Sequence, residues 1–267
     1  MKIGVIGGGN MARAMLRAIL DKGIAEPDRI YLSDVEPGVL EHAQQKFGVH
    51  TSPSNQKIID TCEVIILAVK PQNLPGLSGE VFGKFNRQQL VISVLAGVTM
   101  GKLQNSLGHR AVVRAMPNSP ALIGMGMTVW AASEEVDETG KQVAGSIFKA
   151  MGRELYTQDE SFIDTATAVS GSGPAYFFLF MECLAEAAVN LGCSPEVALA
   201  LVEHTALGSV KYAMQSGTSL KELRRQVTSP GGTTEEALKV FEQAGFRSIV
   251  ELAVKQAFIR AGKIGSS

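Results

Sequence analysis

The chain has 267 residues, of which 45% are hydrophobic and 19% are charged. This composition provides a sizeable core for one large or two modest domains, and it excludes an intrinsically disordered chain. The formal net charge of −1 gives no general attraction to nucleic acid or to an anionic membrane, so we expect no partner of either kind.

The cysteines and the N-terminal segment bear on the cell compartment. Cys62, Cys183 and Cys193 form no CxxC pair, and an odd number does not make a disulfide framework. The N-terminus opens with a strand-like segment, Lys2–Ile6, without the basic and apolar regions of a signal peptide. No run of about 18 uncharged apolar residues follows, so we expect a cytoplasmic protein without a membrane span.

Short β-branched segments alternate with helical patterns over the first 160 residues. These segments are apolar throughout, which is typical of strands buried on both faces of a parallel sheet. The alternation predicts a doubly wound α/β sheet of the Rossmann type over residues 1–160. The expected strands are Lys2–Ile6, Arg29–Leu32, Val64–Ala68, Leu90–Val94, Ala111–Ala115 and Met127–Ala131.

A glycine-rich segment follows the first expected strand and fits the pattern G-x-G-x-x-A. Gly7 permits a tight turn, Gly9 leaves room for a diphosphate, and Ala12 allows close packing of helix on strand. The helix that opens with Asn10 and Met11 would direct unpaired N–H groups at the phosphates. In this context the pattern predicts a dinucleotide site, the alternative being an ordinary glycine turn.

Asp34 follows the second expected strand. An acid at this place typically accepts hydrogen bonds from the adenosine ribose and disfavours a 2′-phosphate. Because Val35 and Glu36 come next and no arginine does, this position favours NADH over NADPH. The alternative is that Asp34 only caps the next turn.

Three more segments follow expected strands: residues 68–72, 95–98 and 116–120. Ligands lie at the carboxyl ends of such strands, so these segments should line the cofactor crevice. The glycine and proline residues in these segments are explained equally well as ordinary turn formers in loops without a ligand.

Strand signals disappear near Ser161, and residues 161–267 are predicted to form an all-α domain. Proline and glycine positions indicate one helix from Pro174 to Gly192 and another from Ser194 to Gly217. The run Tyr-Phe-Phe-Leu-Phe-Met at 176–181 has no polar face, and such a helix must be buried all round. We therefore expect an obligate dimer joined by this domain, the alternative being a central helix in a monomeric bundle.

The segment Thr-Ser-Pro-Gly-Gly-Thr-Thr, which ends at Thr234, joins two helices of this domain. We expect Thr233 at the N-cap with Glu236 completing a capping box. The N–H groups of Gly232, Thr233 and Thr234 would then converge on an anion such as a carboxylate. The hydroxyls, including that of Ser229, add donors, and one could pass a proton. A capped turn without a ligand is the alternative.

Residues 170–174, Ser-Gly-Ser-Gly-Pro, are predicted to form a second glycine loop that contacts substrate, acts as a hinge or only leads into a helix. The four histidines lie outside every candidate loop, and no ligand set has metal-binding spacing, so we expect no metal. Because no histidine or carboxylate base is placed in these loops, the residues favour reduction of a C=N bond over hydroxy-acid oxidation.

Together these motifs resemble the pyrroline-5-carboxylate reductase family over essentially the whole chain. The resemblance implies hydride transfer from NADPH or NADH to the C=N bond of L-1-pyrroline-5-carboxylate, which gives L-proline in the last step of its biosynthesis. It also implies a helical homodimer, often assembled into a decamer, with substrate near the dimer interface. The similar segments are residues 6–11, 68–71, 96–99, 114–120, 170–176 and 229–234.

The resemblance also implies roles for matching positions. Gly232, Thr233 and Thr234 would hold the substrate carboxylate, with Thr234 as the donor near the ring nitrogen and Ser229 beside it. Asn55 would contact the adenosine. The wall beside the nicotinamide would comprise Ala68, Lys70, Pro71, Ala96 and Asn118.

The pair Asp34–Val35 departs from the family pattern, in which many members have Asn-Arg or a serine-rich sequence. The departure leaves the choice between NADPH and NADH open. Two other functions stay possible from the sequence: reduction of another cyclic imine or a β-hydroxy acid, and a non-catalytic NAD(P)-binding sensor. The second is disfavoured because a sensor needs no anion-binding loop at residues 231–234.

Overall fold

The computed structural model describes residues 1–266. They divide into two compact units: Met1–Ser172 together with the chain from Gln256 onward, and Gly173–Lys255. Each unit is described by itself. The first unit extends beyond residue 160, because Arg114 forms ion pairs with Glu160 (2.8 Å) and Asp164 (2.6 Å). The division after residue 160 stays a prediction.

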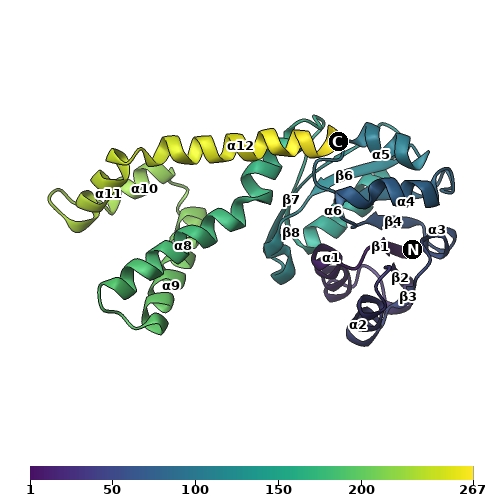
Figure 1. Ribbon diagram of the computed structural model, residues 1–267, viewed down its shortest axis with the longest axis horizontal. Coiled ribbons are helices and arrows are strands. Elements are labelled where there is room, and N and C mark those ends of the chain that lie inside the picture. The colour runs from purple at the N-terminus through teal and green to yellow at the C-terminus, as the bar shows by residue number, and fades with distance from the viewer. Residues whose placement is uncertain (267) are drawn as a thin grey trace. The chain divides into compact units, whose positions relative to one another are not determined.

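The first unit contains an eight-stranded sheet with the order β3-β2-β1-β4-β5-β6-β7-β8 (Figure 1). Strands β1 to β6 are parallel, β7 is antiparallel to β6, and β8 is parallel to β7. This topology confirms the doubly wound sheet, whose strand order reverses between β1 and β4. The strands are β1 (Ile3–Ile6), β2 (Ile30–Ser33), β3 (His50–Ser52), β4 (Val64–Leu67), β5 (Leu90–Ser93), β6 (Val112–Met116), β7 (Gly126–Ala132) and β8 (Gly152–Tyr156).

Every expected strand is present, with ends within one residue of those predicted. The sequence did not predict β3 and β8, which are the two edges of the sheet. Edge strands need not be apolar on both faces: His50 in β3 and Arg153 in β8 are exposed. Neither strand therefore has the continuous apolar run that identifies a central parallel strand.

Helices cover both faces of the sheet, each with its own core. Apolar side chains of α1, α2 and α6 form one buried cluster, and those of α3, α4 and α5 form the other. The bounds are α1 (Asn10–Asp21), α2 (Pro37–Phe47), α3 (Asn55–Thr61), α4 (Leu74–Val81), α5 (Met100–Leu107), α6 (Glu138–Ala150) and α7 (Phe162–Ala166), with short turns η1 (Pro27–Arg29), η2 (Pro71–Asn73) and η3 (Ser119–Ile123).

The glycine loop expected at residues 170–174 is wrong. Residues Thr167–Gly171 form a π-helical turn, η4, which continues from α7, and α8 begins at Gly173. The Ser172 N–H donates to the Thr167 carbonyl (2.8 Å), which is the wide i→i+5 bond of such a turn. Gly171 lies against the sheet, since a Cβ there would come 2.7 Å from Cε of Met116.

The second unit is helical, as expected, but a single chain gives it little core. Its buried apolar side chains, among the residues described, are Ala198, Val202 and Leu223. Phe177 and Phe178 of the apolar run are 66% and 63% exposed, which contradicts a central helix in a monomeric bundle. The helices are α8 (Gly173–Asn190), α9 (Pro195–Ser216), α10 (Leu220–Gln226), α11 (Thr233–Gln243) and α12 (Phe246–Ser266), the last of which ends in the first unit.

No helix in the described part of the chain has the length and apolarity to cross a membrane.

Candidate functional site

The register of the parallel strands aligns the starts of the candidate loops. Ile6, the last residue of β1, pairs with Ser33 of β2 and with Leu67 of β4, and Leu67 pairs with Ser93 of β5. The loops after these strands therefore begin at the same edge of the sheet. Because the strand order reverses between β1 and β4, this edge is where a doubly wound sheet binds its ligand.

The glycine loop after β1 has the shape that a diphosphate needs. Gly7 has φ +96°, and a Cβ there would come 2.9 Å from the backbone of Ala68 and Val69. In contrast, a Cβ at Gly9 would have no atom within 4 Å, so this side of the loop is open. Gly9 is the N-cap of α1 and provides no side-chain cap, which leaves the first-turn N–H groups for a ligand.

Gly8 is a constrained position that sequence reasoning missed. Its N–H donates to Oδ2 of Asp34 (2.7 Å), and a Cβ there would collide with Val39. The pattern G-x-G assigns no role to its middle residue, so only a contact with the next strand and helix could have found it.

The second oxygen of Asp34 bonds to the turn that follows. Its Oδ1 accepts from the N–H of Glu36 (2.9 Å), so Asp34 caps this turn as the alternative expected, and its contact with a ribose stays a prediction. The side chain of Val35, between these two acids, is 82% exposed. The carboxylate of Asp34 thus lies between the glycine loop and the end of β2, where an adenosine ribose is bound in folds of this kind.

Asn55 lies next to the end of β2 in a hydrogen-bonded chain. The hydroxyl of Ser33 donates to Oδ1 of Asn55 (2.7 Å), and Nδ2 of Asn55 donates to Oε2 of Glu80 on α4 (2.8 Å). Ser54 caps α3 through the N–H of Lys57 and so fixes the helix start at Asn55. The sequence predicted Asn55 but not Glu80.

The loops expected beside the nicotinamide start at the same edge. Ala68 follows β4 and its N–H donates to the Ile6 carbonyl (2.9 Å). Lys70 is exposed and precedes η2, which Pro71 begins. Ala96 follows β5, and its neighbour Gly97 has φ +75°.

The end of α12 packs on this last loop, which the sequence did not predict. A Cβ at Gly97 would come 2.8 Å from the carbonyl oxygen of Ala261 and 2.8 Å from Cβ of Ile264. Ala261 is buried. The loop after β5 is therefore supported by a helix that begins in the other unit.

Both the oxygen and the nitrogen of the Asn118 side-chain amide form hydrogen bonds to the backbone. Its Oδ1 accepts from the N–H of Met127 (2.8 Å), and its Nδ2 donates to the carbonyl of Ser170 (3.0 Å). Asn118 thereby connects the loop after β6 to β7 and to the π-helical turn η4.

The loop between α10 and α11, in the second unit, differs from its expected form. Gly232, not Thr233, is the N-cap, so the capping box of Thr233 and Glu236 is wrong. Gly231 has φ +70°, and this turn of the chain carries Gly232 into the extended N-cap conformation. The N–H of Gly232 donates to the Ser229 carbonyl (3.0 Å), which leaves the N–H groups of Thr233 and Thr234 in the unpaired first turn.

Glu235, and not Glu236, accepts a backbone hydrogen bond from the turn before α11. Its Oε2 accepts from the N–H of Gly231 (2.8 Å) and lies 3.6 Å from Nζ of Lys239. The hydrogen bond from Gly231, followed by the charge of Lys239, keeps the pKa of Glu235 below its usual range. Glu235 is therefore ionised at neutral pH and stabilises the turn before α11.

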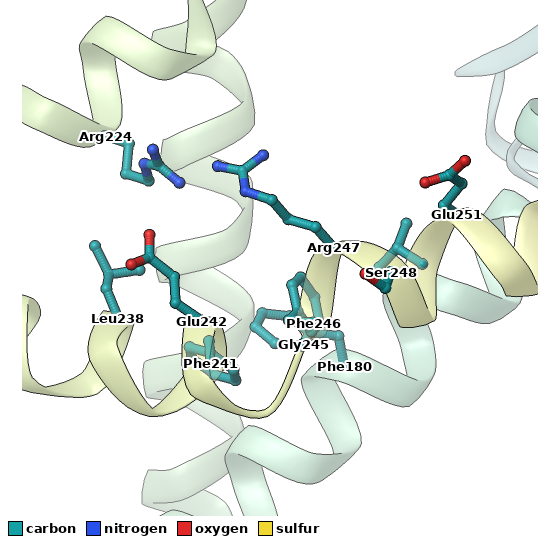
Figure 2. A pocket seen from close by; sticks show the side chains of 11 residues that line it. Phe180, Arg224, Leu238, Phe241, Glu242, Gly245, Phe246, Arg247, Ser248 and Glu251 are labelled. Atoms are coloured by element: carbon teal, nitrogen blue, oxygen red, sulfur yellow. The ribbon is translucent and has the colours of Figure 1, made fainter.

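The second unit also contains a cavity of about 820 Å³, whose lining includes Arg224 before this loop and Leu238 after it. Figure 2 shows Arg224 and Arg247 pointing toward one another across it, near Phe241 and Phe246. Its lining includes no residue of 228–234, so it is not the expected substrate loop. Among the described residues, no group of three His, Cys, Asp or Glu side chains could hold a metal ion.

Comparison with known proteins covers both units. A sequence model described as pyrroline-5-carboxylate reductase dimerisation matches residues 160–264, and one described as NADP oxidoreductase, coenzyme F420-dependent, matches residues 2–97. The pyrroline-5-carboxylate reductase of Synechocystis sp. is 37% identical over 265 residues, 99% of this chain and 98% of the relative. That of Pseudomonas aeruginosa is 38% identical over 98% of this chain and 96% of the relative.

Solved structures agree. The pyrroline-5-carboxylate reductase of Coxiella burnetii matches with a TM-score of 0.87 at 38% identity, over 100% of this chain and 99% of that one. A pyrroline carboxylate reductase of Plasmodium falciparum with NADP bound matches with a TM-score of 0.91 at 30% identity, over 99% of this chain and 98% of that one. The chain therefore belongs to the pyrroline-5-carboxylate reductase family.

Proposed function

We propose that the chain reduces the C=N bond of L-1-pyrroline-5-carboxylate to give L-proline, the last step of proline biosynthesis. The observation that carries the proposal is similarity to these reductases over the full length of both units. The chain is an NAD(P)H-dependent oxidoreductase, and the bound dinucleotide, NADPH or NADH, supplies the hydride.

The first unit would hold the dinucleotide along the carboxyl edge of its sheet. The open face at Gly9 and the uncapped start of α1 suit the diphosphate. Asn118 would act by fixing its loop, since its amide is already bound on both sides. The proposed cofactor-binding residues are Gly7, Gly9, Asn10, Met11, Asp34, Asn55, Ala68, Lys70, Pro71, Ala96 and Asn118.

The second unit would hold the substrate at the start of α11. The N–H groups and hydroxyls of Thr233 and Thr234 are donors for the ring carboxylate, and the positive end of the helix favours an anion there. Ser229 and Gly232 shape the turn through their mutual hydrogen bond. Thr234 would pass the proton near the ring nitrogen. As hydride reaches the carbon of the C=N bond, the π electron pair moves onto the ring nitrogen and takes up this proton, while the carboxylate donors hold the ring in orientation.

We further propose that two copies pair through the helical unit, that the dimers assemble into a decamer, and that the enzyme is cytoplasmic. The exposed aromatic run of α8 and the match to a dimerisation domain support the pairing. The free thiols of Cys62, Cys183 and Cys193 suit a reducing compartment.

The test is turnover by the purified protein. Loss of NADH or NADPH absorbance at 340 nm should depend on L-1-pyrroline-5-carboxylate, and L-proline should accumulate in equal amount. Oxidation with other cyclic imines or β-hydroxy acids but not with this imine would refute the proposal in favour of a related reductase. Dinucleotide binding without turnover of any imine would refute it in favour of a sensor.

A further inference from the structure

Glu80 lies near the adenosine end of the expected dinucleotide site. A single residue, Asn55, lies between Glu80 and that site. Glu80 lies on α4, and its Oε2 accepts a hydrogen bond from Nδ2 of Asn55 (2.8 Å). Asn55 in turn accepts from the hydroxyl of Ser33 (2.7 Å), which is the last residue of β2 and fully buried. Because Ser33 is buried and pairs with Ile6 in the sheet, this chain of bonds holds the Asn55 amide beside the end of β2.

Two donor protons at this end of the site already form hydrogen bonds within the protein. The hydroxyl proton of Ser33 is directed at Asn55, and one amide proton of Asn55 is directed at Glu80. A 2′-phosphate carries nearly two negative charges and needs several donors or a cation. A ribose 2′-hydroxyl, by contrast, can itself donate to a carboxylate.

Three acidic residues lie at or next to this end. Asp34, Glu36 and Glu80 are acids, and the exposed Val35 between the first two offers no donor from its side chain. Within residues 1–266, no lysine or arginine forms an ion pair with Asp34 or Glu80. A phosphate placed here would therefore meet these carboxylates, and the cation on the side of the glycine loop, Arg13, already donates through Nε to the Gly8 carbonyl (3.2 Å).

We propose that Glu80 is a cofactor-specificity residue, which acts through Asn55 to select the 2′-hydroxyl of NADH over the 2′-phosphate of NADPH. The inference rests on the proposed function only in requiring that a dinucleotide bind along this edge. Asp34 excludes the phosphate from the β2 side, and Glu80 excludes it from the α4 side by holding the Asn55 amide and by its own charge.

The experiment measures binding of adenosine fragments, which needs no turnover. Dissociation constants of 5′-AMP and 2′,5′-ADP are determined by calorimetry for the parent protein, Glu80→Gln and Asp60→Asn. Glutamine keeps an acceptor for Asn55 and removes only the charge. Asp60→Asn, on the exposed side of α3, changes the net charge equally and contacts Gln56, not Asn55.

We expect Glu80→Gln to tighten 2′,5′-ADP about five-fold at low salt and to leave 5′-AMP unchanged. The gain should shrink in 0.5 M salt because exposed charges are screened there. Asp60→Asn should change neither ligand. Glu80→Ala, which also releases the Asn55 amide, should tighten 2′,5′-ADP at least as much as Glu80→Gln.

Three outcomes would overturn the inference: equal changes for both ligands in Glu80→Gln, no change for either, or the same gain in Asp60→Asn. If the parent protein binds neither fragment and neither NADH nor NADPH, the dinucleotide site itself is refuted. Binding of both fragments with an unaltered ratio refutes only the role of Glu80.

Discussion

Thr234 is the residue on which the proposed chemistry depends most directly. It is the second residue of α11, where its N–H belongs to the unpaired first turn, and its side chain is half-buried. Neighbouring positions serve the turn itself: Gly231 bonds to Glu235, and Gly232 bonds to Ser229. Thr234 is thus free of the bonds that hold the loop together.

Replacing Thr234 with alanine should lower kcat about 100-fold, since a positioned proton donor contributes roughly that factor or more. The dissociation constant of NADH should stay the same, because the cofactor edge belongs to the other unit. Thr234→Ser keeps the hydroxyl and should restore most of the rate. The control is Thr218→Ala, whose hydroxyl bonds only within its own turn. Steady-state kinetics in which Thr234→Ala equals the parent would remove Thr234 from the chemistry.

His109 is a buried histidine that has no part in the proposed function. One ring nitrogen, Nε2, lies 2.8 Å from the carbonyl oxygen of Gln89, and the ring lies against Phe85. Burial lowers the pKa of His109 below 6.5, although the backbone bonds at Gln89 and Ala111 oppose the shift. The unfolded chain therefore binds a proton at this residue more readily than the folded chain does.

The sign of this linkage predicts loss of stability in acid. The free energy of unfolding should be constant above pH 6.5 as far as His109 is concerned, and should fall as the pH drops from 6.5 toward the lower pKa of the folded state. His109→Gln should flatten this part of the profile, measured by urea unfolding at fixed protein concentration. His42→Gln, at an exposed position, should leave the profile as it is. Identical profiles for His109→Gln and the parent would contradict the assignment.

The end of α12 and the loop after β5 form the least expected contact between elements. Gly97 combines a left-handed backbone with the close approach of Ala261 and Ile264. Gly83 has nearly the same conformation, with φ +69°, but a Cβ there would meet nothing within 4 Å. Alanine substitutions at these two glycines therefore distinguish the cost of backbone strain from the cost of lost packing against α12.

Gly97→Ala should cost the backbone penalty of about 1–2 kcal/mol and, in addition, displace α12 from the loop. Gly83→Ala should cost the backbone penalty alone. Thermal unfolding compares the stabilities, and a fluorescence titration with NADH should show weaker binding for Gly97→Ala only. If both variants lose the same stability and bind NADH equally, α12 does not support the cofactor loop.

The sequence predicts those elements whose formation is determined by residues close together along the chain. Central strands such as β4 are apolar on both faces, and the glycine turn at Gly7 follows from its spacing, so both were predicted. The π-helical turn at Thr167–Gly171 was not, because its glycines and serines suggest a loop until Asn118 binds Ser170 from 52 residues away. Glu80 was missed for the same reason: its partner Asn55 lies 25 residues away along the chain.

The apolar surface of α8 governs the behaviour of the whole molecule. Phe177, Phe178 and Leu179 are each more than 60% exposed in the single chain. Monomeric soluble proteins rarely present such a continuous apolar patch, and a second copy would bury it.

Substituting Phe177→Glu together with Leu179→Glu should dissociate the assembly. Burying each of these side chains is worth about 1.5–3 kcal/mol, so the double variant should weaken pairing at least 100-fold. Analytical ultracentrifugation should then show a monomer, whereas Phe82→Glu, at an exposed position of the first unit, should sediment like the parent. Unchanged sedimentation of the double variant would exclude α8 from the interface.

The chain from Gln256 onward belongs to the first unit although all of Gly173–Lys255 precedes it in synthesis. During translation, the sheet and its glycine turn leave the ribosome early, but the segment that seats Ala261 against Gly97 follows only after the helical unit has been made. A nascent chain thus lacks the support for the loop that is proposed to border the nicotinamide. We therefore expect tight binding of the dinucleotide only after translation has passed the segment proposed to pair the subunits.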